Sequence, residues 1–395
     1  MTRIASRIGW MWATLLASAS AHAATSFTKI ADVNALGPGW ISSSAFFTAP
    51  ALDAGVVAFS ASDNVARWGV YTGSGGALTT VVDQDTLIPG SSTLTFFVPS
   101  EPSISQGVVA FMSGDATGLG FPAVYTASGG SVTLVADQTT PDPDGSGTLV
   151  PDMGAPDIDG ANVSFRGSHN LGRPAYFTSV AGALEISADE STAVPGGTYE
   201  LFLYGTPALD GTQVAFRALA GQAAGIYVAD GGIARVVADG NTALPGDTGN
   251  SASFFDSPAF GGGTVAFEAI GESSGGLYAE IGGLLVRVTD TGVIKGVAAD
   301  GDTVAYHATE GLDAAIYVYR NGVRQRLIGS GDVLDGGTVI GFDFGRNGLD
   351  GDQLAFTVFY DDSSPAVYLA TIPEPGTAML LVAGLAWIAA RRRSR

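Results

Sequence analysis

The stretch "LDGTQVAF" (residues 209–216) is one of seven versions of the same phrase along the chain. The other six are "LDAGVVAF" (52–59), "ISQGVVAF" (104–111), "IDGANVSF" (158–165), "FGGGTVAF" (260–267), "ADGDTVAY" (299–306) and "LDGDQLAF" (349–356). Their final aromatic residues are separated by 52, 54, 51, 51, 39 and 50 residues. A period of about 50 residues is typical of a four-stranded unit repeated around a ring or along a stack.

Each repeat predicts an antiparallel meander of four strands. A short strand leads into an Asp-Gly type of turn, and the strand that ends the quoted phrase follows. After a variable loop comes a third strand such as "GIYVAD" (225–230), and a Gly-Gly turn joins it to a last strand such as "ARVVAD" (234–239). Turns this tight join antiparallel neighbours.

The strands differ in polarity, and this difference predicts where each lies. The second strands are apolar on consecutive residues, so both of their faces should be buried. The last strands carry charges, as expected of an outer edge that must not pair with other chains. These charged residues are Lys29, Glu185, Arg235, Arg287, Arg324 and Arg326. Buried central strands and charged outer strands favour a β-propeller; a β-solenoid or an array of β-sandwiches is the alternative.

The two ends of the repeat region predict how the ring closes. "FTKIAD" (27–32) matches a last strand without its partners, whereas the seventh unit, "GLDGDQLAFTVFYDDSSPAVYLA" (348–370), lacks its last strand. Joining the two would complete a seventh blade. We therefore predict an all-β, seven-bladed β-propeller over residues 24–372, closed by an N-terminal strand.

The repeat also resembles a family of bacterial tandem-repeat proteins with an N-x-x-G-x-x-A-F signature. The resemblance covers residues 27–371, but an apolar residue stands at the asparagine position in every copy. These residues are Leu52, Ile104, Ile158, Leu209, Phe260, Ala299 and Leu349. The resemblance implies no activity.

The N-terminus predicts a signal peptide over residues 1–23. Arg3 and Arg7 precede the apolar stretch "IGWMWATLLASAS" (8–20), and Ala21-His22-Ala23 fits an A-x-A cleavage site. The mature chain would begin near Ala24. A first transmembrane helix is the alternative, although the apolar run is short for one.

The C-terminus, residues 373–395, predicts a short hydrophobic tail helix. Its apolar segment, residues 378–390, has 13 residues and is too short to span a bilayer comfortably. The cluster Arg391, Arg392 and Arg393 within residues 391–395 would stay on the cytoplasmic side. Such a tail would hold an exported protein briefly at the inner membrane.

The order of motifs in this tail, Pro373-Glu374-Pro375, then an apolar segment, then arginines, resembles the PEP-CTERM sorting signal of Gram-negative bacteria. The resemblance covers about 24 residues. It implies that an exosortase processes the tail. It also implies transient anchoring in the inner membrane, then release to the outer envelope, the cell surface or an exopolysaccharide matrix. An ordinary C-terminal membrane anchor is the alternative.

Composition excludes several kinds of chemistry and partner. The chain has no cysteine, so disulfides, thiolate catalysis and cysteine metal sites are absent. Without residues 1–23 and 373–395 it carries 12 basic against 37 acidic residues, a net charge of −25. A body this acidic should repel nucleic acid and attract cations.

Two sets of aspartates recur in the repeats. One set occupies the first turn, where a carboxylate accepting from its own backbone explains it: Asp53, Asp159, Asp210, Asp300 and Asp350. The other ends the outer strands, where strand termination and turn capping explain it: Asp32, Asp83, Asp137, Asp189, Asp239 and Asp290. A shared role in cation binding is the alternative for both sets.

Other motifs are weaker. "PDPDGSG" (141–147) is similar to a calcium loop but lacks the further acidic ligands that the ion needs. His169 lies in "RGSHNLGRP" (166–174) with Arg166 and Arg173, a basic loop that either is solvated or contacts an acidic sugar or a phosphate. "GESSG" (271–275) matches a nucleophile elbow by letters but lacks the strand and helix around it. We therefore assign no catalytic, cofactor-binding or metal-binding residue, with calcium left as a candidate ion.

The sequence favours a non-enzymatic binding or structural propeller at the cell surface or in an exopolysaccharide matrix. Its partners would be an exosortase and either the exopolysaccharide or another surface protein. The first alternative is an enzyme on extracellular polysaccharide that uses carboxylates of the loop-bearing face. The second is a cation-dependent structural surface protein.

Overall fold

The structure is a computed structural model, and it describes residues 25–373 apart from short gaps. The gaps are 38–39, 41–44, 64–66, 98, 116–121, 153, 171, 194–200, 221–222, 247–251, 272–274, 291–292 and 312. The predicted signal peptide with Ala21, Ala23 and Ala24, and the tail from Glu374 onward, lie outside the described residues. Thr25–Ile372 form one compact unit. Within the described part of the chain, no helix is long and apolar enough to cross a bilayer.

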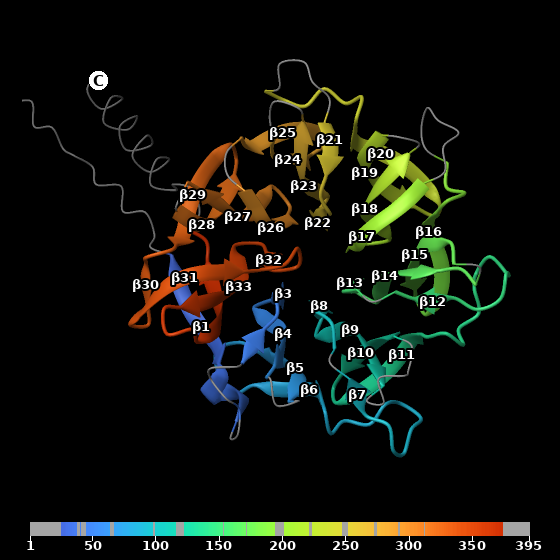
Figure 1. Cartoon of the computed structure of the whole chain (residues 1–395), viewed down its shortest axis with the longest axis horizontal. Helices are drawn as coiled ribbons and strands as arrows, with labels where there is room; N and C mark the ends of the chain where they lie inside the picture. Colours follow the sequence, from blue (N-terminus) through green and yellow to red (C-terminus); the bar gives the residue numbers. More distant parts are fainter. Residues whose placement is uncertain are drawn as a thin grey trace, which may run out of the picture. The chain divides into compact units, whose positions relative to one another are not determined.

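The compact unit is a seven-bladed β-propeller, which confirms the predicted fold (Figure 1). Its strands form seven antiparallel sheets around a central axis. The first three blades contain β2 (Phe46–Phe47), β3 (Ala51–Asp53), β4 (Val56–Ser62), β5 (Trp68–Gly73) and β6 (Thr79–Asp83); β7 (Phe96–Phe97), β8 (Ser103–Ser105), β9 (Val108–Asp115), β10 (Ala123–Ser128) and β11 (Ser131–Ala136); and β12 (Val150–Pro151), β13 (Asp157–Asp159), β14 (Asn162–Ser168), β15 (Pro174–Val180) and β16 (Ala183–Asp189).

The remaining four blades continue the pattern around the ring. They contain β17 (Leu201–Asp210), β18 (Gln213–Ala220), β19 (Ala223–Asp230) and β20 (Ile233–Asp239); β21 (Ala252–Phe255), β22 (Ala259–Gly261), β23 (Thr264–Gly271), β24 (Gly275–Ile281) and β25 (Leu284–Thr289); β26 (Val293–Asp300), β27 (Thr303–Glu310), β28 (Asp313–Arg320) and β29 (Val323–Gly329); and β30 (Val333–Leu334), β31 (Gly337–Asp343), β32 (Leu349–Asp350), β33 (Gln353–Tyr360) and β34 (Pro365–Thr371). In blades 4 and 6 the innermost strand is continuous; in the other blades it is split into two pieces.

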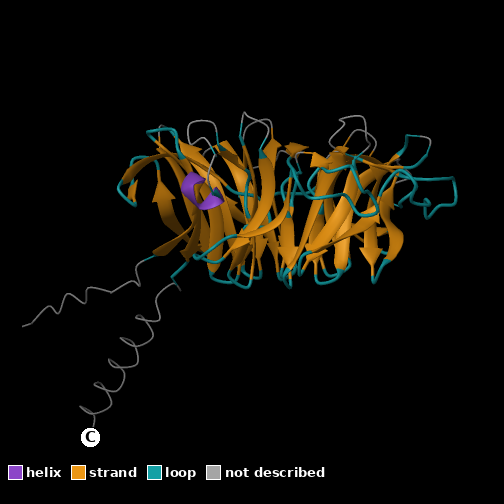
Figure 2. Ribbon diagram, turned by 90° about the horizontal axis from the view of Figure 1, so that it is seen from below, coloured by secondary structure: helices purple, strands orange, loops and turns teal. Residues whose placement is uncertain are grey.

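The propeller has two unlike faces (Figure 2). The tight turns within each blade, such as Ala54-Gly55 and Gly231-Gly232, lie on one side, which we call the turn face. Because each blade is a meander, the loops after the second strands and the connections between blades lie on the opposite side, the loop face. This separation follows from the antiparallel meander that each repeat predicts.

An aromatic pair lies in the middle of every blade. The last aromatic residue of each quoted phrase faces an aromatic partner on the next strand, with ring centroids 5.5–6.3 Å apart and planes inclined by 24–30°. The pairs are Phe59–Tyr71, Phe111–Tyr125, Phe165–Phe177, Phe216–Tyr227, Phe267–Tyr278, Tyr306–Tyr317 and Phe356–Tyr368. All of these side chains are buried. Such pairs add to the stability that apolar burial alone provides, which explains why the repeat keeps an aromatic residue here.

The N-terminal strand β1 (Ser26–Asp32) closes the ring, as predicted. It pairs antiparallel with β34, from Ser26 opposite Thr371 to Asp32 opposite Ala366. The last blade is thus completed by the first strand of the chain.

The short spacing of 39 residues also has a structural cause. Blade 5 ends at Thr289 and the inner strand of blade 6 begins at Val293, so a long connection on the loop face is missing between these two blades. The strand order within blade 6 is unchanged.

The first-turn aspartates join the blades rather than cap their own turns, so the sequence interpretation was wrong on this point. Each carboxylate accepts a hydrogen bond from a backbone N–H in the first turn of the next blade. The N···O distances are 2.6–2.7 Å. The donors and their acceptors are Ala54 and Asp350, Gln106 and Asp53, Gly211 and Asp159, Gly263 and Asp210, and Gly351 and Asp300.

Two blades lack the aspartate but keep the connection. In blade 2 the Ser105 hydroxyl accepts from Gly160 N–H at 2.9 Å. In blade 5 the Gly261 carbonyl accepts from Gly301 N–H at 3.2 Å. Gly262 has a φ of +54°, and a Cβ there would lie 2.3 Å from the Gly301 nitrogen, so this backbone contact requires glycine. Seven hydrogen bonds therefore link the seven blades in a closed circle, the turn ring.

Removing one carboxylate of the turn ring should lower stability without changing the fold. We expect Asp159→Ala to lower the free energy of unfolding by about 1–3 kcal/mol, because a charge-assisted bond is lost and the Gly211 N–H loses its acceptor. Urea unfolding followed by tryptophan fluorescence measures the change. Asp361→Ala, on an exposed loop, is the control. An Asp159→Ala midpoint equal to that of the control would contradict a structural role for the ring.

Candidate functional site

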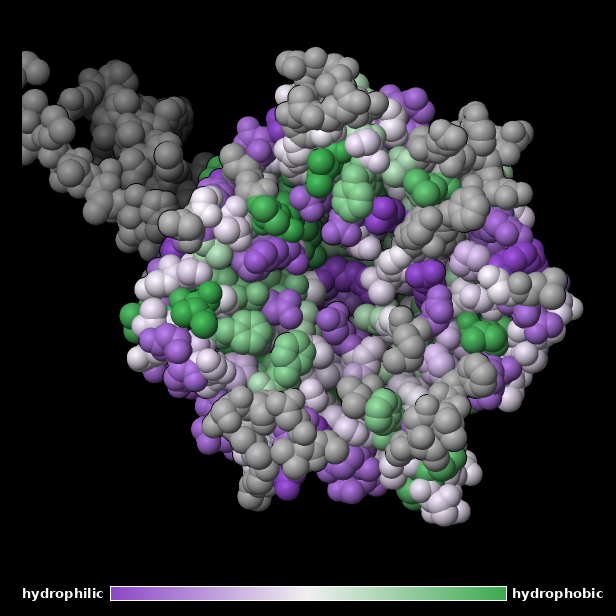
Figure 3. All heavy atoms as spheres, viewed as in Figure 1, coloured by the Kyte–Doolittle hydropathy of each residue, from purple (hydrophilic) through white to green (hydrophobic). Residues whose placement is uncertain are grey.

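The propeller axis opens into a hollow at each face. The loop-face hollow, which we call the axial pocket, has a volume of about 280 Å³ and is lined by residues of all seven blades. The turn-face hollow is smaller, about 150 Å³, and is lined by the five aspartates of the turn ring. Figure 3 shows hydrophilic residues gathered around the centre of the loop face. The axial pocket is the candidate functional site because loop faces on repeated scaffolds carry most binding sites.

Seven equivalent positions, one per blade, surround the axis at the axial pocket. Each lies five residues before the first residue of the first turn, and five of the seven precede a proline. The residues are Ala49, Glu101, Ala155, Thr206, Ser257, Gly296 and Arg346. Five are small, so the axis stays open there. Glu101 and Arg346 supply the charges of this circle.

Arg346 and Asn347 of blade 7 reach across the axis to the opposite blades. The Arg346 guanidinium donates to the Ala155 carbonyl at 3.1 Å and to the Thr206 hydroxyl, and its Nε lies 3.9 Å from Asp157 Oδ2. The Asn347 side chain donates to Asp157 Oδ1 at 2.8 Å and to the Ser103 hydroxyl at 2.9 Å. We call this pair, which spans the axis, the axial bar. It lines both the axial pocket and the turn-face hollow.

Asp157 anchors the axial bar from inside the protein. Its side chain is buried, and it accepts from the backbone N–H of Leu209 at 2.7 Å and from the Ser103 hydroxyl at 2.9 Å. Burial raises the pKa of the Asp157 carboxyl, while the Arg346 charge and these hydrogen bonds oppose the rise. A buried carboxyl needs such partners, and the bar supplies two of them.

Four carboxyl groups line the axial pocket: Glu101, Asp256, Glu268 and Asp343. Protein atoms surround the Glu101 carboxyl, although part of the side chain reaches solvent. This desolvation raises the pKa of Glu101; the nearby Arg346 charge opposes the rise, and the Asp343 charge adds to it. Burial also raises the pKa of Glu268, and the Asp256 charge adds to the effect. Burial likewise raises the pKa of Asp343. Groups of this kind can accept hydrogen bonds when ionised and donate one when protonated.

A wider hollow of about 500 Å³ lies where β1 joins the last blade. Its polar groups pair with one another: Lys29 lies 3.2 Å from Asp335, and Tyr368 donates to Asp335 at 2.8 Å. Tyr360 and Tyr368 also share a hydrogen bond of 2.6 Å. These contacts fasten the closing strand, so we assign this hollow a structural role.

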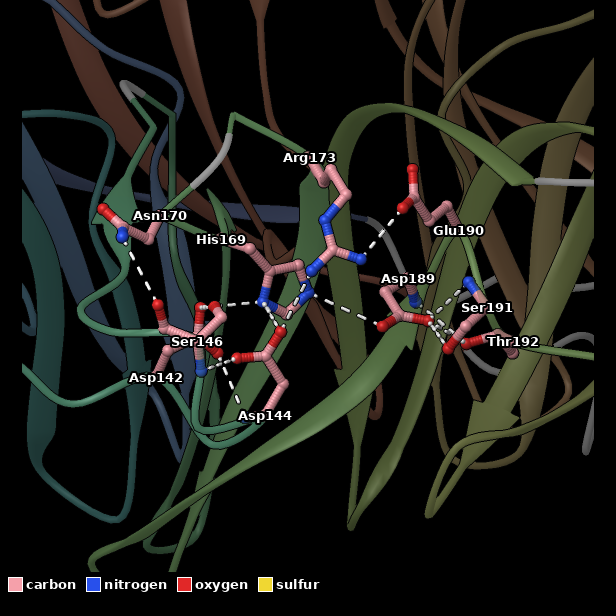
Figure 4. Close-up of polar contacts among 10 residues, drawn as sticks. All are labelled: Asp142, Asp144, Ser146, His169, Asn170, Arg173, Asp189, Glu190, Ser191 and Thr192. Carbon is pink, nitrogen blue, oxygen red and sulfur yellow. Dashed lines mark hydrogen bonds and ion pairs between the residues drawn. The ribbon is translucent and has the colours of Figure 1, made fainter.

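The structure corrects the interpretation of the basic loop around His169. His169 is buried, with 1% of its surface exposed, and carboxylates lie on both sides of its ring (Figure 4). Its Nδ1 lies 2.8 Å from Asp142 Oδ2 and 3.4 Å from Asp144 Oδ2. Arg173 binds Asp144 and Glu190, and Arg166 lies 3.2 Å from Asp152. The loop is therefore neither solvated at His169 nor a free basic patch, because each cation already faces a carboxylate.

The structure also locates the other sequence candidates. Asp83, Asp137, Asp189 and Asp239 cap the turns that follow their strands, accepting from backbone and hydroxyl groups two and three residues on, which confirms the capping interpretation. Asp32 accepts from the N–H groups of Asn34 and Ala35. His307 is buried beside Phe342, and desolvation lowers its pKa to about 4. The central residues of "GESSG", 272–274, lie outside the described residues.

Comparison with known proteins shows the family. The chain belongs to a family of unknown function, DUF7453, whose model matches residues 12–317. A search of curated proteins finds no match.

Solved structures share the fold at low identity. An acylaminoacyl peptidase of Pyrococcus horikoshii is 10% identical with a TM-score of 0.52, over 86% of this chain and 54% of that chain. An acylaminoacyl peptidase in complex with Z-Gly-Gly-Phe-chloromethyl ketone is also 10% identical with a TM-score of 0.52, over 83% and 51%. The chain thus spans about half the length of these peptidases. At this low identity the similarity shows a shared propeller fold and nothing more.

The carboxyl groups of the axial pocket should make stability depend on pH. A carboxyl whose pKa is raised in the folded chain stabilises it when protonated and loses that contribution as pH rises through the folded pKa. We therefore expect Glu101→Gln to unfold at a higher urea concentration than the wild type at pH 7. The difference should vanish below the ordinary pKa of glutamate, about 4.3.

Glu185→Gln, on the exposed outer strand β16, is the control for this measurement. A lower midpoint for Glu101→Gln than for the wild type at pH 7 would mean that attraction by Arg346 outweighs desolvation, contrary to the expectation.

Proposed function

We propose that this protein is an exported, exosortase-sorted protein of the cell surface or exopolysaccharide matrix, which acts as a non-enzymatic binding propeller. Its ligand would enter the axial pocket. The observation that carries the proposal is the polar lining of this pocket, where four carboxyl groups and two cations from different blades converge on one hollow.

The chemistry of the pocket favours a ligand rich in hydroxyl groups. Ionised Glu101, Asp256, Glu268 and Asp343 accept hydrogen bonds, and hydroxyl groups donate them. Lys295 and Arg346, which also line the pocket, donate to hydroxyl or ring oxygens. With four acidic and two basic groups, the site should repel polyanions such as nucleic acid or uronate-rich chains. A volume of about 280 Å³, near the lower end for ligand sites, suits a short segment of a neutral or amino-sugar glycan.

The export and sorting part of the proposal comes from the two chain ends. The A-x-A site at Ala21–Ala23 and the Pro373-Glu374-Pro375 tail resemble a leader and a PEP-CTERM signal. An exported chain without cysteine must hold together without disulfides, and here strand pairing closes the ring.

A second candidate is an enzyme that acts on extracellular polysaccharide. It is favoured by Glu101 and Asp343, because Asp343 lies near enough to raise the pKa of Glu101. Two neighbouring carboxyl groups, one of them with a raised pKa, are the groups that supply an acid and its partner in glycoside hydrolysis. The binding experiment below separates the two candidates.

Binding should depend on the carboxyl groups of the pocket. We expect the purified protein to co-sediment saturably with neutral exopolysaccharide. The double variant Asp256→Asn/Glu268→Gln should bind at least about tenfold more weakly, because each carboxylate loses its charge and one acceptor oxygen is replaced by a donor NH2 group. Asp230→Asn, on the turn face, is the control. Reducing sugar in the supernatant, abolished by Glu101→Gln, would replace the binding proposal with the enzymatic one. Equal binding by the double variant would place the ligand outside the pocket.

Sorting should depend on the tail. Deleting residues 373–395 is expected to shift the protein from the envelope or matrix fraction to the medium, as measured by immunoblotting of cell fractions. Replacing the residue pair Ser394-Arg395 with alanines, which leaves Pro373–Pro375 and Arg391–Arg393 in place, is the control. Unchanged localisation of the deleted chain would rule out sorting by the tail, whatever the binding experiment shows.

A further inference from the structure

A cluster of polar side chains lies on the loop face of blade 3, outside the axial pocket (Figure 4). Asp142 and Asp144 come from the connection between β11 and β12, and His169 follows β14 directly. Asp189 ends β16 of the same blade. Three segments that are distant in sequence thus bring their polar atoms together around one imidazole ring.

The cluster contains more negative charge than the protein neutralises. The Asp142 side chain is fully buried, and its carboxylate is bound by His169 and by the backbone N–H of Asp144 at 3.2 Å. Arg173 is shared between Asp144 at 3.1 Å and Glu190 at 2.9 Å. Even with a protonated imidazole, four carboxylates would face two cations. Buried carboxylates are ordinarily paired or bound to a metal ion.

The ligand atoms are spaced as a metal ion requires. Nδ1 of His169 lies 2.8 Å from Asp142 Oδ2 and 3.4 Å from Asp144 Oδ2. One ligand atom from each of the three residues lies within 4.8 Å of the other two. Two ligands bound at about 2.1 Å lie about 3.0 Å apart in octahedral and about 3.4 Å apart in tetrahedral coordination. The observed separations match these values to within a few tenths of an ångström.

The far side of the imidazole provides an independent indication. His169 Nε2 is buried and makes no hydrogen bond, and it points to Asp189 Oδ2 at 3.5 Å. A histidine that binds a metal through one nitrogen usually directs its other N–H at a carboxylate, which fixes the tautomer. Ser191 and Thr192 hold Asp189 in place for this role through its Oδ1.

We propose that Asp142, Asp144 and His169 bind one divalent transition-metal ion, with Asp189 orienting the histidine. One imidazole and two carboxylates suit ions such as Zn²⁺ or Mn²⁺, whereas Ca²⁺ prefers a larger set of oxygen ligands. The ion would tie the β11–β12 connection to the end of β14.

The test uses the full chain after dialysis against a chelator. Zn²⁺, Mn²⁺ and Ca²⁺ are added separately, bound metal is measured by atomic emission after gel filtration, and the melting temperature is recorded. We expect one Zn²⁺ or Mn²⁺ per chain, a rise in melting temperature of several degrees, and weaker binding of Ca²⁺. Asp142→Asn and His169→Gln should abolish the stoichiometric ion, and Asp189→Asn should weaken binding about tenfold.

Asp85→Asn, on the corresponding connection of blade 1, removes the same charge and should bind the ion normally. If Asp142→Asn does not fold without metal, the partly exposed Asp144→Asn decides the point, and it should lose the ion while keeping the metal-free melting temperature. The proposal would be overturned if the wild-type chain retained no ion at one equivalent of metal. It would also be overturned if the Asp144→Asn variant bound the ion as well as the wild type does. The cluster would then be an ion network built around His169.

Discussion

The hydrogen bonds of the turn ring are the constraint on which the rest of the structure depends. Blades of a propeller diverge from the axis, so their strands do not pair with those of the next blade. The innermost strands are also short, between two and ten residues. At the axis a backbone N–H in each first turn lacks a strand partner and would be costly to leave unpaired. A carboxylate, a hydroxyl or a carbonyl from the preceding blade accepts from each one, and the seven turns are thereby held at one spacing around the centre.

This constraint also creates the electrostatic character of the axis. Five aspartates converge at the turn face, and burial together with the charges of Asp300 and Asp53 raises the pKa of Asp350. The axial bar places the Arg346 guanidinium between this acidic hollow and the acidic axial pocket. Arg346 therefore offsets part of the negative charge on both sides and leaves the pocket open toward the loop face. The cluster around His169 on blade 3 has a similar excess of negative charge, away from the axis.

The sequence predicted the number of blades and the closing strand, because these follow from periodicity, strand polarity and turn chemistry. It did not predict that Asp53 would accept a hydrogen bond from the next blade, because a turn aspartate can equally well accept one from the backbone of its own turn. The axial residues left a signal in the repeats. Five repeats have proline at the position of Asn347, and four have alanine at the position of Asp157. Aligning the repeats position by position would have singled out these departures. The proximity of Asp142 to His169 left no such signal, since it depends on the path of an irregular connection.

Closure by β1 has a directional consequence. Because Ser26 pairs with Thr371, the polypeptide enters and leaves the propeller at the same blade and on the turn face. Whatever precedes Ser26 or follows Thr371 is therefore joined to the propeller on that face. The axial pocket and the blade-3 cluster then point away from the point of attachment. Both connections of the propeller to the chain ends therefore lie on the face opposite the axial pocket.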